Sequence, residues 1–143
     1  MSTKRVSYTW LFFFFAFVSI SCNSGVDQKK LQGAWRIDSL YDFYNGFTYM
    51  NRNPQPAEVH VYKGEHTMLR RGMGHERPYY YSIEGNQLMI SDTLGAPASP
   101  HIVLRLDSSQ LVLKKESAPI FPGEKQERYV IRYFTKIPLD SLK

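Results

Sequence analysis

The sequence has 143 residues, enough for one domain, and carries 18 Lys and Arg against 13 Asp and Glu, for a formal charge of +5. This surplus is too small to indicate a nucleic-acid-binding face, which is normally a clustered basic surface. The single cysteine excludes an intramolecular disulfide bond and every metal cluster built from cysteine alone. We therefore expect a small protein that binds no nucleic acid.

The first 21 residues have the pattern of a secretion signal. Lys4 and Arg5 precede an apolar run over residues 10–18, and small residues follow before Cys22. The run is too short to cross a bilayer, which takes about 20 apolar residues, so we predict a signal peptide over residues 1–21. Consecutive phenylalanines with no polar face argue against a buried helix of the domain.

Cys22 resembles the lipobox cysteine of bacterial lipoproteins, which receives a diacylglycerol on its thiol and becomes the new N-terminus. The resemblance implies a membrane anchor at Cys22 and a lipidated tether over residues 22–30. Because Asn23 is not an aspartate, it also implies an outer-membrane location facing the periplasm. Acyl chains anchor durably, since each buried methylene contributes about 0.8 kcal/mol. The alternative is a secreted protein with a spare thiol.

In the rest of the chain, apolar and polar residues alternate with a period of two, and turn residues interrupt this pattern. Asp27 is placed to cap a short helix over residues 28–32, which Gly33 ends. Asn45-Gly46 is the strongest hairpin signal in the chain. The predicted strands cover residues 35–43, 47–50, 58–62, 66–73, 77–84, 87–91, 101–107, 111–113 and 127–137. The predicted loops with proline cover residues 51–57, 92–100 and 117–126.

Eight or nine short strands at this spacing indicate a β-sandwich or a barrel. Short hairpin connections favour an up-and-down meander, and closure of eight strands removes the exposed edges that invite aggregation. We therefore predict an all-β, up-and-down antiparallel eight-stranded barrel over residues 31–137, after a short N-terminal helix and before a C-terminal tail over residues 138–143. In the first strand, simple alternation places on one face Trp35, Ile37, Tyr41 and Phe43.

Three segments resemble one family. Gly33-Ala34-Trp35, after a short helical turn, is similar to the Gly-x-Trp motif of lipocalins. Residues 81–90 and 102–113 resemble successive hairpins of the lipocalin-like domains in small envelope lipoproteins of Bacteroidetes-type bacteria. The resemblance implies a lipocalin-like barrel over residues 31–136 and an apolar ligand. It also implies an arginine packed across the tryptophan, for which the last strand offers Arg132 or Arg128.

A closed barrel of this size has room for a small ligand, which inward-facing side chains would line. Tyr79 and Tyr81 share one strand face, and tyrosine joins an apolar body to a polar tip, which suits an amphiphilic ligand. The structural alternatives are ordinary packing for the tyrosines and a plug at the closed end of the barrel for Trp35. The predicted ligand-binding residues are Trp35, Tyr79, Tyr81, Ile83, Leu88, Ile90, Leu104, Leu106 and Arg132.

Other functions have weaker support in the sequence. No nucleophile elbow, zinc-protease helix or cluster of carboxylates occurs, so we expect neither an enzyme nor a cofactor. A set of ligands suited to Cu(I), which could converge only through a bend, consists of His66, Met68, Met73 and His75. The alternative is that these are solvated histidines and gap-filling methionines. A module that contacts another envelope protein would use the predicted loops, with Ile120 and Phe121 as its apolar patch.

Overall fold

The computed structural model describes residues 25–121 and 125–142. The predicted signal peptide and Cys22 lie outside the described residues, so lipidation stays a prediction. The chain enters the fold through the helix α1 (Gln28–Leu31), close to its predicted bounds. The Asp27 side chain accepts a hydrogen bond of 3.0 Å from the backbone N–H of Lys29 and so caps the helix, as predicted.

Nine strands and a final 3₁₀ turn, η1 (Leu139–Leu142), follow within the described part of the chain. Each strand overlaps a predicted one. The strands are β1 (Gly33–Tyr44), β2 (Phe47–Arg52), β3 (Val59–Lys63), β4 (Thr67–Gly72), β5 (His75–Glu84), β6 (Gln87–Ser91), β7 (Ser99–Leu106), β8 (Gln110–Glu116) and β9 (Arg128–Ile137). No helix among these residues has the length and apolar character needed to cross a bilayer.

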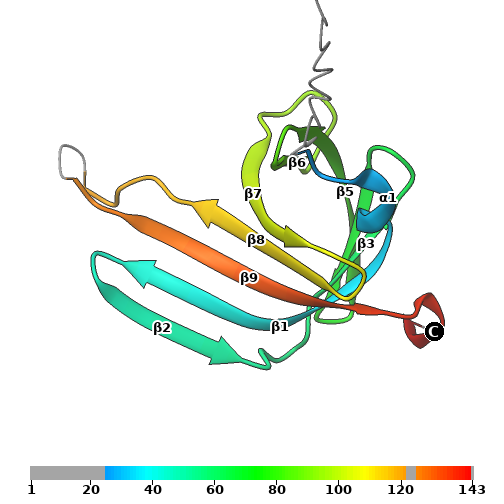
Figure 1. Ribbon diagram of the computed structural model, residues 1–143, viewed down its shortest axis with the longest axis horizontal. Helices are drawn as coiled ribbons and strands as arrows, with labels where there is room; N and C mark the ends of the chain where they lie inside the picture. The colour runs from blue at the N-terminus through cyan, green and yellow to red at the C-terminus, as the bar shows by residue number, and fades with distance from the viewer. Residues whose placement is uncertain (1–24, 122–124, 143) are drawn as a thin grey trace, which may run out of the picture.

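The strands close into a barrel because β1 pairs along both of its edges. Its first residues pair with β3, and its opposite edge pairs with β9, from Ala34 opposite Ile137 to Tyr44 opposite Arg128. Strands β3 to β9 pair antiparallel in chain order, so β1 and β3–β9 form a closed ring of eight strands (Figure 1). These pairings confirm the predicted all-β, up-and-down antiparallel barrel of eight strands with a short N-terminal helix.

The strand β2 lies outside this ring. It pairs with the second half of β1 across a turn at Asn45 and Gly46, whose φ angles of 47° and 89° are both positive, as a type I′ hairpin needs. Figure 1 shows β2 and the adjoining parts of β1, β9 and β8 running away from the barrel. We call this region the projecting sheet; it consists of residues 41–44, 47–52, 116 and 128–131.

A bulge in β1 reverses the faces of this strand. The register with β9 shifts between Ile37 and Ser39, because β1 has an extra residue there. Trp35 and Ile37 are buried inside the barrel. Phe43 faces outward, and its ring stacks on Tyr129 with 4.8 Å between the ring centroids. The prediction that the four apolar side chains of this strand share one face is wrong, because simple alternation does not count the extra residue.

A second bulge lies in β7, where the register with β8 shifts between Val103 and Arg105. Val103 and Leu106 both pack against the core, although they are three positions apart. Leu104 points away from the interior and is 51% exposed. The prediction that Leu104 lines the interior is therefore wrong, again because one inserted residue inverts the alternation. Leu106 lies inside the barrel, as predicted.

The interior next to α1 is filled by side chains around Trp35, which is fully buried. The indole Nε1–H donates a hydrogen bond of 2.7 Å to the backbone carbonyl of Leu31, the last residue of α1, and so joins the helix to the barrel. Trp35 thus plugs this end of the barrel. The core packed around it consists of Leu31, Ile37, Tyr62, Met68, Tyr81, Leu88, Leu111, Leu113 and Phe134.

The cation beside the tryptophan is a lysine. The Nζ atom of Lys136 lies 4.9 Å from the centroid of the Trp35 ring, within cation–π range. Arg128 pairs with Tyr44 at the other end of β9, in the projecting sheet. Arg132 faces a carboxylate at 3.8 Å instead. The expectation of an arginine across the indole is therefore wrong, because Lys136 is the β9 residue that lies opposite Trp35.

Candidate ligand-binding site

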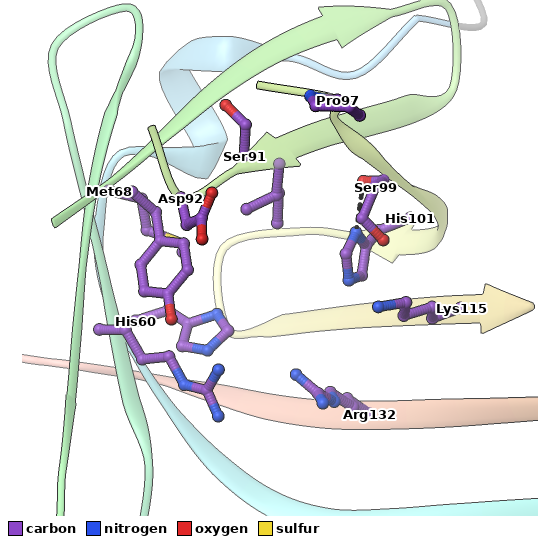
Figure 2. A pocket seen from close by; sticks show the side chains of 12 residues that line it. His60, Met68, Ser91, Asp92, Pro97, Ser99, His101, Lys115 and Arg132 are labelled. Atoms are coloured by element: carbon purple, nitrogen blue, oxygen red, sulfur yellow. Dashed lines mark hydrogen bonds between the residues drawn. The ribbon is translucent and has the colours of Figure 1, made fainter. Parts of the chain in front are cut away.

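The barrel interior is hollow on the side of the core away from α1. The cavity measures about 330 Å³, near the lower end of the range of about 300–1,000 Å³ usual for small-molecule sites. Figure 2 shows side chains converging on it from several strands. It is lined by His60, Met68, Arg70, Tyr79, Ile90, Ser91, Asp92, Pro97, Ser99, His101, Lys115 and Arg132.

The cavity wall has an apolar part and a charged part. Apolar surface comes from three neighbouring strands, through Met68, Tyr79 and Ile90 on β4, β5 and β6. Positive charge comes from Arg70 on β4 and, across the cavity, from Lys115 and Arg132 on β8 and β9 (Figure 2). A site with apolar surface and a few converging polar groups is the usual form of a small-molecule pocket.

Strand alternation explains why charged side chains face inward here. On β8, Leu111 and Leu113 are buried in the core, and Lys115 continues the same face beyond it. On β9, Phe134 is in the core, and Arg132 lies two residues before it on the same face. Each strand therefore places an apolar residue in the filled part of the barrel and a cation in the hollow part.

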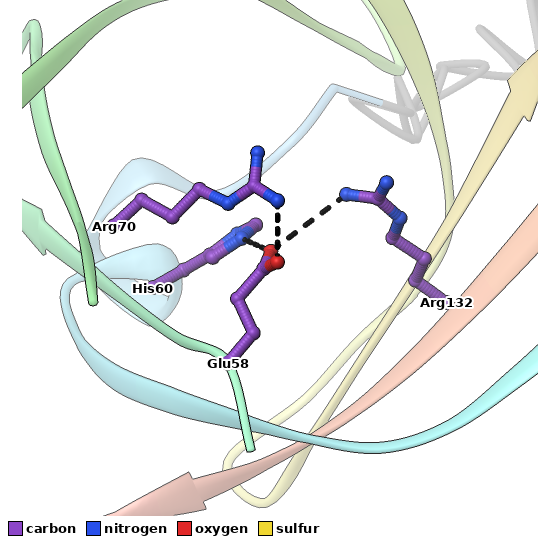
Figure 3. A network of polar contacts seen from close by, with 4 residues as sticks. All are labelled: Glu58, His60, Arg70 and Arg132. Atoms are coloured by element: carbon purple, nitrogen blue, oxygen red, sulfur yellow. Dashed lines mark hydrogen bonds and ion pairs between the residues drawn. The ribbon is translucent and has the colours of Figure 1, made fainter. Parts of the chain in front are cut away.

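A carboxylate links three of the polar groups (Figure 3). Glu58 lies just before β3, and its side chain is 20% exposed. One carboxylate oxygen lies 2.5 Å from His60 Nε2, and the other accepts a hydrogen bond of 2.5 Å from Arg70 Nη2. Arg132 Nη1 lies 3.8 Å from Glu58 Oε1. One negative charge is thus shared by two guanidinium groups from opposite sides of the barrel.

The Glu58 carboxyl is ionised at neutral pH. Burial alone would raise its pKa, but the hydrogen bond to His60 and the positive charges of Arg70 and Arg132 are among the causes that outweigh this effect. The pKa of Glu58 is lowered to about 2 from an ordinary value of 4.5. This carboxylate therefore keeps its charge over the whole physiological range.

Both cavity histidines are neutral at pH 7. Burial lowers the pKa of His60, although Glu58 opposes the change. Burial also lowers the pKa of His101 to about 4; a hydrogen bond to Ser99 opposes this, and the charges of Lys115 and Arg132 add to it. The backbone carbonyl of Ser99 can only accept, so His101 Nδ1 carries the proton of this 2.9 Å bond. His101 Nε2 is then left as an acceptor.

Three buried polar atoms near Glu58 have no hydrogen-bond partner among the described residues: His60 Nδ1, the Tyr62 hydroxyl and Arg132 Nε. Because the Glu58 carboxylate accepts from His60 Nε2, the neutral ring has its lone pair on Nδ1. Two of these atoms, His60 Nδ1 and Arg132 Nε, belong to residues of the cavity wall. Because most buried polar groups in folded proteins have a partner, a water molecule or a bound polar group could pair with them.

The structure brings some of the predicted site residues together and separates others. Tyr79, Ile90 and Arg132 line the cavity. Leu104 lies outside the barrel. The remaining five pack inside the barrel without lining the cavity: Trp35, Tyr81, Ile83, Leu88 and Leu106. Tyr81 has a structural contact, because its hydroxyl donates a hydrogen bond of 2.8 Å to the carbonyl of Gly64. Ligand binding by any of these residues stays a prediction.

Sequence reasoning missed most of the charged and polar wall. In the sequence, Arg70 and Lys115 each adjoin a second cation, which is usual for solvated side chains, and neither these two nor His60 and His101 belong to a functional motif. Strand alternation is the signal that could have found three of them, because Arg70, Lys115 and His60 each lie two positions from a side chain of the core. For example, His60 precedes Tyr62 by two positions on β3. Charge at an inward-facing position is evidence of function rather than of solvent exposure.

The predicted copper ligands do not converge on one site, and the predicted apolar patch lies in a loop. Met68 is buried in the core, whereas Met73 lies in the turn after β4, His75 begins β5, and both are exposed, as is His66. Within residues 25–121 and 125–142, no group of three or more His, Cys, Asp or Glu is placed to hold a metal ion. Ile120 and Phe121 are exposed in the loop between β8 and β9.

Comparison with known proteins finds only distant similarity. No family model matches the sequence. No curated protein matches it either. A crystal structure of lobster apocrustacyanin A1 aligns with a TM-score of 0.46 and 13% sequence identity, over 81% of this chain and 67% of that chain. The description of the barrel given above rests on its strand pairings alone.

Proposed function

We propose that this protein holds a small apolar or amphiphilic molecule in the barrel cavity and catalyses no reaction on it. The observation that carries this proposal is a preformed hollow of about 330 Å³ inside a closed barrel. Its wall joins apolar side chains to a few converging polar ones, as small-molecule sites do. Burial of the ligand's apolar surface would contribute about 25 cal/mol per Å².

A substitution that fills the cavity tests this proposal. Ser99 lies opposite Ile90 on the neighbouring strand and lines the cavity, so Ser99→Phe places a ring in the space that the ligand would occupy. We expect the purified protein to bind the neutral dye N-phenyl-1-naphthylamine with one site per chain, and Ser99→Phe to weaken this binding about ten-fold or more, as lost burial of a ring-sized apolar surface implies. Dye fluorescence measures the binding.

The control is Ser82→Phe, the same change at an exposed position of β5. It is expected to bind the dye as the unchanged protein does. Equal dye binding by Ser99→Phe and the unchanged protein, or no saturable binding by the unchanged protein, would count against a ligand in this cavity. Native mass spectrometry of the purified protein adds an independent measurement, because a ligand that copurifies appears as a discrete mass increase.

The proposal extends to location: a lipoprotein of the bacterial envelope, with the lipocalin-like domain anchored through Cys22 in the outer membrane and facing the periplasm. It is supported by the signal-like leader and by the small residue before Cys22. The backbone N–H of Val26 donates a hydrogen bond of 3.0 Å to the carbonyl of Gly85, so the tether would meet the barrel at its filled end. The cavity would then face away from the membrane.

The substitution Cys22→Ser tests the anchor. In a bacterial host, the unchanged protein is expected in the membrane fraction and should incorporate an alkyne-tagged palmitate. Cys22→Ser should incorporate none and should leave the washed membranes, because stable anchoring needs the acyl chains. Equal labelling of the two proteins would contradict lipidation at Cys22.

A second candidate function is a module that contacts another envelope protein through the tip of the projecting sheet. The observation that favours it is a group of exposed apolar side chains, Phe47, Ile120 and Phe121. The turn after β1 and the start of β9 hold this tip together, because Asn45 exchanges hydrogen bonds of 3.0 and 2.9 Å with Glu127. A module of this kind would keep its activity when Ser99→Phe fills the cavity, whereas a ligand carrier would lose it.

A further inference from the structure

We propose that the cavity takes an amphiphile with an anionic head, specifically a carboxylate that Lys115 and Arg132 hold while its chain lies against Met68 and Ile90. This inference rests on the proposed function, because it names the chemical class of the ligand for the same site. It is carried by the charge balance of the cavity wall, by the placement of its cations and by the division of the wall into apolar and charged parts.

The two arginines of the wall share a single carboxylate. Arg70 takes one oxygen of Glu58 at 2.5 Å, and Arg132 lies 3.8 Å from the other. Glu58 also binds His60, so its acceptor capacity is divided among three partners. The Nε atom of Arg132 is buried and has no hydrogen-bond partner among the described residues. The guanidinium of Arg132 is therefore the less satisfied of the two.

Lys115 adds a further positive charge to the cavity wall. No ion pair to Lys115 occurs among the described residues, whereas its neighbour Lys114 donates to Glu116 over 2.9 Å on the outer face. The carboxylate that lines the cavity, Asp92, is paired with Arg77 at 3.4 Å. The wall thus has a surplus of positive charge, which a bound anion would neutralise.

Lys115 and Arg132 are placed to act on one group. In the register of β8 and β9, Arg132 lies opposite Leu113, so Lys115 is its diagonal neighbour on the inward face. Diagonal neighbours are within reach of each other's long side chains. Figure 2 shows both side chains extending toward the same space, beneath His101. A carboxylate in that space could accept a charge-assisted hydrogen bond from each of them.

The chain of the amphiphile would occupy the apolar side of the cavity. Met68 and Ile90 belong to the core or pack against it, and both line the cavity. Figure 2 shows Met68 across the cavity from Lys115 and Arg132. The volume of about 330 Å³ suits a short chain. Each buried methylene would contribute about 0.8 kcal/mol, so the apolar wall adds affinity that a free small anion cannot obtain.

Matched ligands separate the head from the chain. Octanoate has both a carboxylate head and an alkyl chain. 1-Octanol has the same length of alkyl chain with a neutral head, and acetate has the carboxylate head without the chain. With the purified protein at pH 7.5, isothermal titration calorimetry should give octanoate an affinity about ten-fold or more above that of 1-octanol, the size expected when charge-assisted hydrogen bonds replace neutral ones. Acetate should bind at least ten-fold more weakly than octanoate, because it buries no chain.

The adjacent lysines provide a matched pair of variants. Lys115→Gln removes the inward cation. No carboxylate among the described residues loses an ion-pair partner by this change, so the fold should be unaffected. It is expected to weaken octanoate binding about ten-fold or more and to leave 1-octanol binding unchanged. Lys114→Gln makes the same change on the outer face and should alter neither affinity by more than about two-fold.

His101 reports the anion directly. The pKa of its ring is lowered by burial and by the charges of Lys115, Arg132 and His60, while the Ser99 carbonyl opposes the change. A carboxylate beside Lys115 and Arg132 would offset their charges, so octanoate should raise the pKa of His101 in an NMR titration. The neutral head of 1-octanol should raise it less.

The outcomes distinguish this inference from the proposed function. Equal affinities for octanoate and 1-octanol, or equal effects of Lys115→Gln and Lys114→Gln, would overturn the anionic head and leave a ligand cavity in place. Equal affinities for acetate and octanoate would overturn the amphiphile, because the site would then serve a free small anion. A protein that binds none of these ligands and no N-phenyl-1-naphthylamine would overturn both proposals.

Discussion

Replacing Trp35 with alanine is expected to lower the free energy of unfolding by about 3–5 kcal/mol, the usual cost of truncating a buried tryptophan. The side chain is fully buried, and the core packs around it. The substitution also leaves the carbonyl of Leu31 without its 2.7 Å hydrogen bond and Lys136 without the ring it covers. Domains have only about 5–15 kcal/mol of stability, so this loss removes a large share of it.

Urea denaturation followed by far-ultraviolet circular dichroism measures the effect. Phe47→Ala is the control, since it truncates an aromatic residue that is 78% exposed, and it should change stability by no more than about 0.5 kcal/mol. Trp35→Phe keeps an apolar ring and should fall between the two. An equal loss in Trp35→Ala and Phe47→Ala would mean that Trp35 is not the plug of the barrel.

Local sequence signals predicted the strands and their order well. Asn45-Gly46 forms the hairpin turn that its residues favour, and Asp27 caps α1. Regular alternation and short turns predicted a meander, and closure followed from the cost of leaving strand edges exposed. These features depend on residues close together in the chain, so the sequence states them directly.

The faces of two strands could not be predicted in the same way. A single extra residue between Ile37 and Ser39 reverses β1, and another between Val103 and Arg105 reverses β7. Each bulge is a property of the pairing with a neighbouring strand, so neither is visible in the alternation of one strand. The misplacement of Leu104 follows from the second bulge alone.

The charged wall of the cavity was hidden for a different reason. Lys115 and Arg70 each adjoin another cation in sequence, and a pair of cations is normally solvated. In the barrel one member of each pair faces inward: Arg70 toward Glu58 and Lys115 toward the cavity. Arg70 pairs with Glu58 on another segment of the chain, and Lys115 lies diagonal to Arg132 on the neighbouring strand. Such a site exists only after the barrel closes.

The same polar groups make the stability of the protein sensitive to acid. The folded-state pKa of His101 is lowered to about 4 from 6.5, so the unfolded chain binds more protons than the folded one below pH 6.5. The contribution of neutral His101 to the free energy of unfolding is therefore fully present above about pH 6.5 and is lost as the pH falls toward 4. The shift corresponds to about 3 kcal/mol, at 1.36 kcal/mol for each pKa unit.

Protonation of Glu58 lowers the free energy of unfolding further at lower pH. Its folded-state pKa is lowered to about 2 from 4.5, so its contribution is present above about pH 4.5 and is lost as the pH falls toward 2. This shift also corresponds to about 3 kcal/mol. We expect urea denaturation to show stability falling between pH 7 and pH 3, first as the buried histidines His101 and His60 take up protons and then, below about pH 4.5, as Glu58 does.

Two substitutions separate the steps. His101→Gln cannot take up a proton, so the decline between pH 6.5 and pH 4 should become shallower, whereas the decline below pH 4.5 should remain. Glu58→Gln should show the opposite pattern on a lower starting stability, because Arg70 and His60 lose their shared carboxylate. His66→Gln is the control, since its ring is 72% exposed, and its curve should match that of the unchanged protein. If His101→Gln and His66→Gln give the same curve, the buried histidine is not the group that couples folding to pH.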